Sequence, residues 1–303
     1  MKIWVTGGSG SLGISLLKSL RSTHSEAQIL APNHSQLALE DSKAVHEFVS
    51  EHKPTHVLHL AAQVFGIAGH KENPAGSLLR NTVIDNSVFS ALNSHPPEWV
   101  YYASTVAAYG FPYATLPLIE EDWLNGDPHD SEYGYAMAKR HALSYLEILH
   151  KVHSTKFVYG LTTNLFGTGD RFLEGRGHVV ISLLEKAALA KKENTQLEVW
   201  GSGLASRDFL STTDASSLIL DMFNKHVGVV NVASGQEITI ASIAEDIVQI
   251  FELSKGFKFV GFNEGITNRV CSIKKLNGYA PSLDNVDSVL QLREEIEKFK
   301  TNH

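Results

Sequence analysis

The sequence predicts an α/β protein built on a doubly wound parallel sheet, with a second, smaller α/β domain beside it. Two observations predict this fold class. Short apolar runs alternate with helical segments through the first half of the 303-residue chain, and these runs lack the polar alternation of half-exposed strands. The glycine-rich stretch "VTGGSGSLG", residues 5–13, follows the first apolar run directly, at the edge where such sheets bind their ligands.

The expected strands are rich in Val, Ile and aromatic residues. They are residues 2–6, 27–30, 56–62, 98–104 and 156–163, and a sixth run, 228–234, is expected to return to the same sheet. Runs of this kind are buried on both faces, which is typical of parallel strands covered by helices. The sheet should therefore be parallel.

Helix signals fill the spaces between these strands. The first expected helix covers residues 11–20, and the second covers 40–52 with an Asp41 or Ser42 cap. A third, 77–95, is stopped by Pro96 and Pro97. Strand and helix alternate in this way in doubly wound sheets of the Rossmann type.

After residue 163 the pattern changes. A helix near 178–193, a strand at 197–203, a loop at 204–212 and a helix at 239–253 are expected there. We therefore expect a dinucleotide-binding domain at 1–163, to which 205–234 returns. Residues 164–204 and 235–303 would form a discontinuous substrate domain over a cleft.

Composition and charge narrow the choice of partners. The formal net charge is −7 with both signs interspersed, so no basic stripe is present for nucleic acid. The single cysteine, Cys271, excludes an intrachain disulfide, and His150 and His153 lack a carboxylate or cysteine partner, so no metal site is expected. No apolar run suggests a signal peptide or a membrane span. We expect a soluble, cytoplasmic protein with a small-molecule partner.

The glycine stretch predicts a bound dinucleotide. Gly7, Gly10 and Gly13 would allow a tight turn, close approach to a diphosphate and close packing of helix on strand, while the helix start supplies N–H donors. The second expected strand ends in "LAPNHS", which has no acidic residue for a ribose and no arginine. Asn33, His34 and Ser9 tolerate a 2′-phosphate without clamping it, which slightly favours NADP(H) over NAD(H).

Tyr135 and Lys139 in "SEYGYAMAKRHAL" stand at i and i+4, so both project from one face of a helix. A nearby ammonium stabilises a phenolate, and the lysine can also bind a ribose. Taken alone, this spacing is more often an ordinary half-buried helix pattern. A catalytic interpretation is favoured because the pair follows a dinucleotide turn and a strand that ends in "ASTVAAYG", where Thr105 supplies a hydroxyl.

This order of motifs resembles the extended short-chain dehydrogenase/reductase family over nearly the whole chain. Within that family it is most similar to the epimerase/reductases of the GDP-L-fucose synthase type. The motifs that carry the likeness are "DSKAVHEF", "HLAAQVFGI", "TTNLFGTGDRF", "HVVISLLEKA", "EVWGSGLASRDFL" and "NVASGQEITIASIAE". The resemblance implies that Tyr135 donates a proton, with Thr105 and Lys139 supporting it.

The resemblance also implies two sets of binding residues. Besides the three glycines and the catalytic pair, the expected cofactor contacts are Ser9, Leu12, Asn33, Asp41, Ala61 and Ala62. The sugar nucleotide would contact Asn164, Lys186, Trp200, Arg207 and Arg269. Apart from the resemblance, Arg207 in "GSGLASRDF" suits a diphosphate because a guanidinium binds two phosphate oxygens, although a surface salt bridge is the alternative. Trp200 could equally belong to the core.

The pattern breaks beside the catalytic hydroxyl. Enzymes of the fucose synthase type carry a cysteine two places after it, which works with a histidine to epimerise carbons beside the ketone. His178 matches the histidine, whereas the cysteine position holds Ala107 and the preceding one Val106. Neither side chain can accept a proton, which epimerisation and dehydration both need. His178 could then bind a sugar hydroxyl or only cap a helix.

The sequence therefore predicts an NAD(P)H-dependent reductase, or the reverse dehydrogenase, acting at C4 of a nucleotide-linked sugar such as a GDP-4-keto-6-deoxy-hexose. Epimerase activity should be weak or lost. The alternatives are a 4-epimerase that keeps its cofactor, a bifunctional epimerase/reductase and a non-catalytic nucleotide-binding protein. The resemblance also implies a homodimer through the helices at 76–94 and 132–153.

Overall fold

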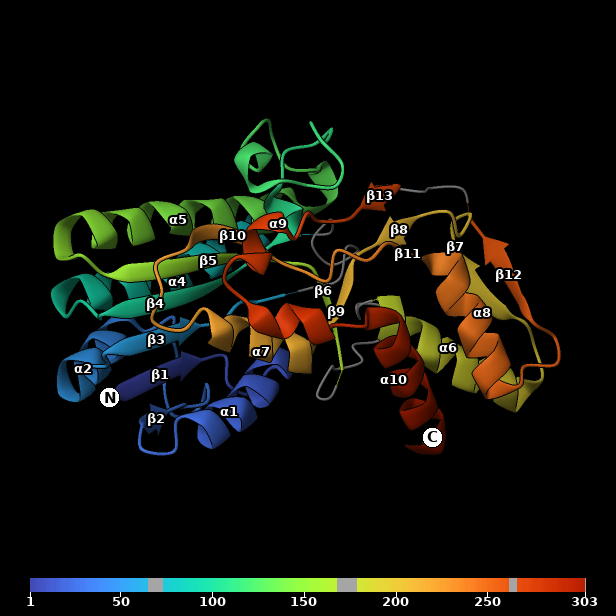
Figure 1. Ribbon diagram of the computed structural model, residues 1–303, viewed down its shortest axis with the longest axis horizontal. Coiled ribbons are helices and arrows are strands. Elements are labelled where there is room, and N and C mark those ends of the chain that lie inside the picture. Colours follow the sequence, from blue (N-terminus) through green and yellow to red (C-terminus); the bar gives the residue numbers. More distant parts are fainter. Residues whose placement is uncertain (65–72, 168–178, 262–265, 303) are drawn as a thin grey trace.

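The computed structural model describes residues 1–64, 73–167, 179–261 and 266–302. Its largest element is a six-stranded sheet in which every pairing is parallel, in the order β2-β1-β3-β4-β5-β10 (Figure 1). The strands are β1 (Lys2–Thr6), β2 (Gln28–Leu30), β3 (His56–His59), β4 (Trp99–Thr105), β5 (Lys156–Thr162) and β10 (Gly228–Val232). The parallel sheet predicted from the apolar runs is thereby confirmed.

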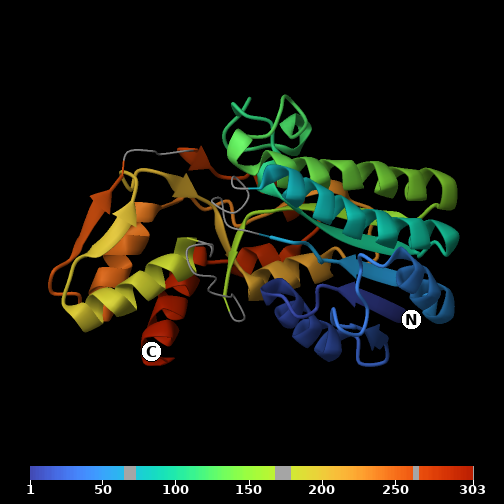
Figure 2. The same cartoon turned by 180° about the vertical axis from the view of Figure 1, so that it is seen from behind.

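Helices cover both faces of this sheet. One face carries α2 (Ser42–His52), α4 (Pro74–Ser94) and α5 (Tyr133–His153), and the other carries α1 (Ser11–Thr23) and α7 (Thr212–Asp221). Figures 1 and 2 show the two helical layers from opposite sides. The Asp41 side chain caps α2 by accepting a hydrogen bond from Ala44 N at 3.0 Å, as the sequence predicts. The sheet is therefore doubly wound.

The second half of the chain adds smaller sheets with a separate apolar core. The pairs are β6 (Asn164–Phe166) with β9 (Phe209–Ser211) and β7 (Leu197–Trp200) with β12 (Phe257–Val260), and β8 (Ser206–Arg207) lies between β11 (Ile238–Thr239) and β13 (Asn268–Arg269). Within the described residues, the remaining helices and 3₁₀ turns are α6 (Val179–Glu193), α8 (Ile240–Phe251), α9 (Lys274–Asn277), α10 (Ser288–Asn302), η1 (Val106–Ala108), η2 (Glu120–Asp122), η3 (Asp130–Glu132) and η4 (Pro281–Asn285). Phe209, Ile243 and Ile296 belong to this core. Their clustering supports a second domain, whose boundaries stay a proposal.

Two local expectations need correction. The loop expected at 204–212 contains β8 and β9, because these residues pair with strands from distant parts of the chain. Strand β3 ends at His59 rather than at residue 62. The reason is that Ala61 N donates to the Thr6 side chain, at 3.2 Å, instead of continuing the backbone ladder. Short strands that depend on distant partners carry little local signal.

The strand order reverses at β1, which has β2 on one side and β3 on the other. Such a reversal opens a ligand-binding crevice at the carboxyl ends of the strands. Gly7 follows β1 with φ +70°, and a Cβ atom there would lie 2.7 Å from Ala61 N. A Cβ at Gly13 would lie 2.2 Å from Gly7 O. Both positions require glycine, so the turn is held close to the end of β3 and to the start of α1.

Within the described ranges, no helix combines the length and the apolar character that crossing a membrane requires.

Replacing Gly7 by alanine tests this close approach. Gly228 is a matched control, because it has the same φ of +70° but no atom of the described residues lies within 4 Å of the place that a Cβ would take. We expect Gly228→Ala to lower the free energy of unfolding by about 1–2 kcal/mol, the cost of a left-handed alanine. Gly7→Ala adds a backbone collision and should cost roughly 2–5 kcal/mol. Urea unfolding of both variants measures the difference, and equal losses would contradict the close packing.

Candidate active site

Thr105 ends β4 at the carboxyl edge of the central sheet, opposite Thr162 of β5. Its Oγ1 accepts a hydrogen bond from Ala107 N at 3.1 Å, which begins the turn η1. That bond occupies a lone pair of the hydroxyl, so its proton stays available to a substrate oxygen. The half-buried Thr105 is therefore placed as the sequence predicts, at the end of a central strand.

Tyr135 and Lys139 lie on α5, which packs against this edge. The Lys139 side chain is 1% exposed, and its Nζ donates to Ala103 O at 2.8 Å. The same Nζ lies 4.4 Å from the centroid of the Tyr102 ring and 5.8 Å from that of Tyr135. Ala103 is two residues before Thr105, so the structure joins the lysine to the strand that carries the hydroxyl.

Arg140 fixes the turn after Thr105 onto the same helix. Its Nε donates to Ala108 O at 2.8 Å, and its two Nη atoms donate to Gly126 O at 2.9 Å and Trp123 O at 3.1 Å. Carbonyl groups of two separate segments, η1 and the turn after η2, thus converge on one guanidinium. Sequence reasoning missed this role, because nothing in the local pattern separates Arg140 from an ordinary surface arginine.

The electrostatics of Tyr135 differ from the sequence-based expectation. Burial raises the pKa of its phenol, and the Asp85 and Glu132 carboxyl groups raise it further. Burial also lowers the pKa of Lys139, while Asp85 opposes that change. The lysine is therefore not the main influence on the phenol, contrary to the expected acidification. At neutral pH Tyr135 stays protonated, which suits a proton donor better than a base.

The glycine turn has the features of a diphosphate cradle. Gly10 precedes α1, and no described side chain caps this helix start. The tip of the turn, Ser9 and Gly10, is exposed, and Leu12 is half-buried. An anion at this position would supply the missing cap and face the positive end of the helix. The described residues therefore fit the phosphates of a dinucleotide.

The remaining predicted cofactor contacts are of mixed character. Ala61 and Ala62 follow β3, half-buried beside the glycine turn. The Asn33 side-chain oxygen accepts from Ser35 N at 3.0 Å and so belongs to a local turn, while Asp41 caps α2. Both polar groups therefore have structural roles as well, and the described side chains at the end of β2 form no strong ribose or phosphate clamp.

A buried polar network leads from the glycine turn to Tyr102 of β4, whose ring contacts Lys139 of α5. Thr6 Oγ1 lies 2.6 Å from His59 Nδ1, and His59 Nε2 lies 3.0 Å from Asp85 Oδ1. Tyr102 donates to the other Asp85 oxygen at 2.7 Å. All four side chains are buried. Sequence reasoning missed the network, although an aspartate within the apolar stretch "VIDNSVF" is a usable signal.

The residues predicted to bind a sugar nucleotide come from the smaller sheets and α6. Lys186 Nζ lies 5.8 Å from the centroid of the Trp200 ring, and Trp200 is 76% exposed. The alternative of a core tryptophan is therefore wrong. Asn164 is committed to the protein through its Nδ2, which donates to Asp208 O at 2.9 Å. Of these predicted residues, Trp200 is thus open to a ligand, whereas the side-chain nitrogen of Asn164 is already bonded within the protein.

Arg207 and Arg269 are register partners on the parallel strands β8 and β13. Arg207 donates to the carbonyl groups of Ser206 and Ile266, each at 2.7 Å. Burial, together with the nearby Arg269, lowers the pKa of Arg207 to about 10. Arg269 forms an ion pair with Glu132, three residues before Tyr135. Two adjacent guanidinium groups repel each other, and a bound diphosphate would relieve that repulsion.

The positions next to Thr105 offer no acid or base. Val106 and Ala107 are both buried in η1, where the chain turns away from β4. His178 lies outside the described residues. Among the residues that are described, no three His, Cys, Asp or Glu side chains are grouped as a metal site would require. Among the described residues, the groups at this edge that could take part in proton transfer are therefore those of Thr105, Tyr135 and Lys139.

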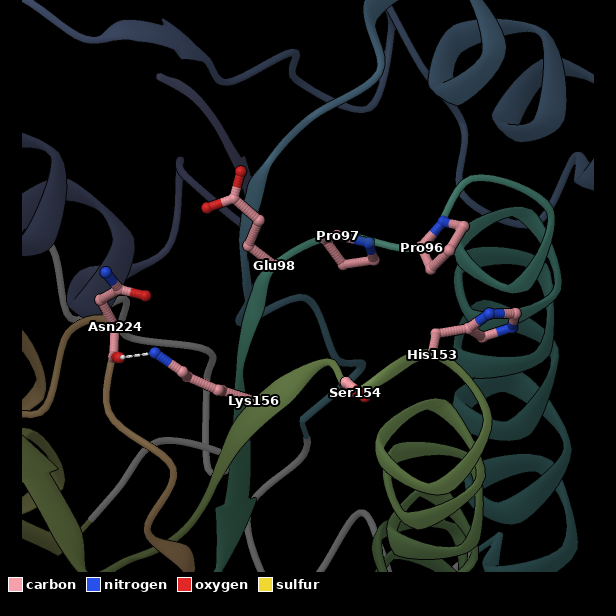
Figure 3. Close-up of a pocket in the computed structure, with 7 residues that line it drawn as sticks. All are labelled: Pro96, Pro97, Glu98, His153, Ser154, Lys156 and Asn224. Atoms are coloured by element: carbon pink, nitrogen blue, oxygen red, sulfur yellow. Dashed lines mark hydrogen bonds between the residues drawn. The ribbon is translucent and has the colours of Figure 1, made fainter.

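A surface hollow of about 380 Å³ lies at the opposite end of the sheet (Figure 3). It is lined by residues at the starts of β4 and β5, including Pro97 and Glu98 before β4 and Lys156 at the first position of β5, and by Asn224. Lys156 Nζ donates to Asn224 O at 3.3 Å across it. Parallel sheets of this kind bind ligands at the carboxyl ends of their strands, so this hollow is separate from the candidate site.

Comparison with known proteins agrees with this geometry. A GDP-L-fucose synthase of Sinorhizobium fredii is 29% identical over 260 residues, which cover 85% of this chain and 81% of that one. A GDP-L-colitose synthase of Yersinia pseudotuberculosis is 27% identical, with 82% of each chain covered. A GDP-L-fucose synthetase of Naegleria fowleri, solved bound to NADP, has a TM-score of 0.89 at 25% identity, covering 99% of this chain and 93% of that one.

The family model described as the NAD dependent epimerase/dehydratase family matches residues 3–233. This match confirms the predicted resemblance to the extended short-chain dehydrogenase/reductases, and the relatives agree with its fucose synthase branch. The chain belongs to the NAD dependent epimerase/dehydratase family and is an NAD(P)-dependent enzyme.

Proposed function

We propose that the protein is an NAD(P)H-dependent reductase of a 4-keto nucleoside-diphosphate sugar, of the GDP-4-keto-6-deoxy-hexose kind. One observation carries the proposal. A phenol that stays protonated and a buried ammonium share one helix at the end of β4, beside the Thr105 hydroxyl, whereas Val106 and Ala107 are apolar. These groups can protonate a carbonyl oxygen, and neither of the two positions after Thr105 carries the acid or base that epimerisation would use there.

In the proposed reaction the ketone oxygen accepts hydrogen bonds from Thr105 and Tyr135. The reduced nicotinamide supplies the hydride to C4. Tyr135 gives its proton to the oxygen as negative charge develops there, so the ketone gains one hydride and one proton and becomes an alcohol. The Lys139 ammonium, 5.8 Å from the Tyr135 ring, stabilises the phenolate that is left. Solvent then returns the proton.

The raised pKa of Tyr135 supports the reductive direction. Oxidation of an alcohol would need the phenolate as a base, and burial makes this form scarce at neutral pH. Reduction starts from the neutral phenol, which is the dominant form, so the protonation state of Tyr135 suits the proposed reduction.

NADP(H) is the proposed cofactor. Residues 31–36, which follow β2, include no carboxylate of their own that would bind the ribose hydroxyls of NAD(H), and the Glu40 carboxylate nearby is paired with the exposed His34 at 3.3 Å. The relative from Naegleria fowleri was solved with NADP. The glycine turn after β1 would hold the diphosphate, and Lys139 would bind the nicotinamide ribose.

The proposed substrate is a guanosine diphosphate sugar. Arg207 suits its diphosphate, with the buried Arg269 beside it adding positive charge, and the exposed Trp200 beside Lys186 offers a stacking surface for the base. The names of two relatives, GDP-L-fucose synthase and GDP-L-colitose synthase, support guanosine as the nucleoside.

A second copy of the chain is the proposed partner. Leu79 on α4 and Ile148 and Val152 on α5 are exposed apolar residues on two helices that pack side by side. Exposed apolar side chains on neighbouring helices are typical of a helical dimer interface.

The role of Tyr135 is tested by Tyr135→Phe, which removes only the hydroxyl. We expect at least a roughly 1000-fold loss of kcat for reduction of a 4-keto GDP-sugar, with NADPH affinity changed less than about threefold. Tyr133→Phe, on the exposed side of the same helix start, is the control and should keep full activity. Wild-type turnover by Tyr135→Phe would remove the phenol from the mechanism.

The nucleoside of the substrate is identified by assaying the wild type with 4-keto dTDP- and UDP-sugars alongside the GDP-sugar.

The absence of an acid or base at Val106 and Ala107 is tested by running the reaction in deuterated water. We expect no deuterium at C3 or C5 of the sugar product, because exchange there needs a group that removes a carbon-bound proton. Product NMR reads both positions. Deuterium at either carbon would mean that another base replaces the missing cysteine, and the enzyme would then be an epimerase/reductase.

The dimer surface is tested by Leu79→Glu combined with Val152→Glu. Light scattering after size exclusion should give twice the 33.3 kDa chain mass for the wild type and the single chain mass for the double variant. Leu189→Glu, at another exposed leucine, on α6, is the control and should stay dimeric. A wild-type monomer would refute the proposed interface.

A further inference from the structure

Two charged side chains lie buried where α4 and α5 meet the central sheet. Lys139 comes from α5 and Asp85 from α4, and each residue is only 1% exposed. An ionised group in the interior loses its hydration and therefore needs compensating partners. The direct hydrogen bond of Lys139 Nζ goes to a neutral acceptor, Ala103 O. Its compensating negative charge has to come from elsewhere in the interior.

Tyr102 of β4 connects the two charged residues. The Lys139 ammonium lies over the face of the Tyr102 ring, 4.4 Å from its centroid, and the hydroxyl at the end of that ring donates to Asp85 at 2.7 Å. The carboxyl group polarises the phenol, which makes the ring face more attractive to a cation. Asp85 also acts directly on the lysine, since it opposes the lowering of the Lys139 pKa by burial.

Asp85 is held in place by a second donor. His59 Nε2 lies 3.0 Å from Asp85 Oδ1, and His59 Nδ1 lies 2.6 Å from Thr6 Oγ1. Thr6 in turn accepts from Ala61 N at 3.2 Å, so its hydroxyl proton is available to the histidine. Both carboxyl oxygens of Asp85 therefore have partners. The chain of hydrogen bonds ends at Ala61, beside Gly7 in the glycine turn.

Other titratable and charged groups face this pair from each neighbouring element. His59 comes from β3, Tyr102 from β4, Tyr159 from β5, and Tyr135 and Arg140 from α5, while Glu132 lies just before α5. Lys139 and Asp85 are the fully buried cation and the fully buried anion of this group.

We propose that Asp85 is a positioning residue for the reduction: its carboxylate is the counter-charge that keeps the buried Lys139 charged and in place beside Tyr135. The effect of Asp85 on catalysis rests on the proposed function. The electrostatic pairing of Asp85 with Lys139 is independent of the proposed function, and it can be measured in the absence of any substrate.

The kinetic test uses Asp85→Asn, which keeps the shape and removes the charge. Asp85 raises the pKa values of both Lys139 and Tyr135, so the loss of its charge lowers both. As the pH is raised, the variant should therefore lose activity at a lower pH than the wild type does. We expect the alkaline limb of the kcat profile to move down by about one pH unit, with the KM for NADPH within about twofold of wild type. Asp85→Glu, which keeps the negative charge, should return the alkaline limb of the kcat profile to its wild-type position. Glu147→Gln on the exposed face of α5 is the matched control and should not move it.

The second test is a double-mutant cycle of Asp85→Asn and Lys139→Met, read by urea unfolding at neutral pH. If the two charges are paired, the double variant should lose less unfolding free energy than the two single variants lose together. The difference should correspond to a roughly tenfold or larger factor in the unfolding equilibrium constant. Additive losses, or an alkaline limb that Asp85→Asn leaves unmoved, would overturn the proposal. If the wild type reduces no keto sugar nucleotide, the proposed function fails, and the cycle alone then decides the role of Asp85.

Discussion

A fully buried ammonium at the carboxyl end of the central strands is the constraint on which the site depends. Lys139 reaches from α5 to the backbone of β4 at Ala103 and lies over the Tyr102 ring. Removing this charge from water is costly, so the surrounding elements have to supply compensation. They do so with a carbonyl group, an aromatic face and the Asp85 carboxyl group on α4. Helices α4 and α5, strand β4 and the Tyr135 phenol are therefore fixed relative to one another.

The same polar network extends to the place where the cofactor would bind. Gly7 approaches the backbone of Ala61 so closely that a side chain would collide with it. Ala61 N is bonded to Thr6, which leads through His59 to Asp85. Buried hydrogen bonds thus lead from the turn that would receive a diphosphate to Tyr102, and the ring of Tyr102 contacts the Lys139 ammonium of α5. A preorganised arrangement of this kind needs little rearrangement during the reaction.

Much of this fold follows from local patterns in the sequence. Apolar runs predicted the six strands of the main sheet, and the glycine spacing and the i, i+4 pair of Tyr135 and Lys139 predicted the two halves of the site. The short strands β8 and β9 could not be predicted, because their partners are distant in the chain. The roles of Asp85, His59 and Arg140 likewise depend on which side chains the fold brings together. The raised pKa of Tyr135 depends on burial, which the pattern Tyr-x-x-x-Lys does not report.

The central claim is that this arrangement reduces a ketone at C4 of a nucleotide sugar. It is tested most directly by following the transferred hydrogen with NADPH that carries deuterium in the transferable position at C4 of its nicotinamide ring. The account predicts one deuterium at C4 of the sugar for each NADPH oxidised, read by NMR of the product. The contradicting result is a C4 epimer that forms without net oxidation of NADPH and carries no deuterium at C4. In that case the hydrogen at C4 of the sugar would have been removed and returned within one catalytic cycle by an enzyme-bound cofactor.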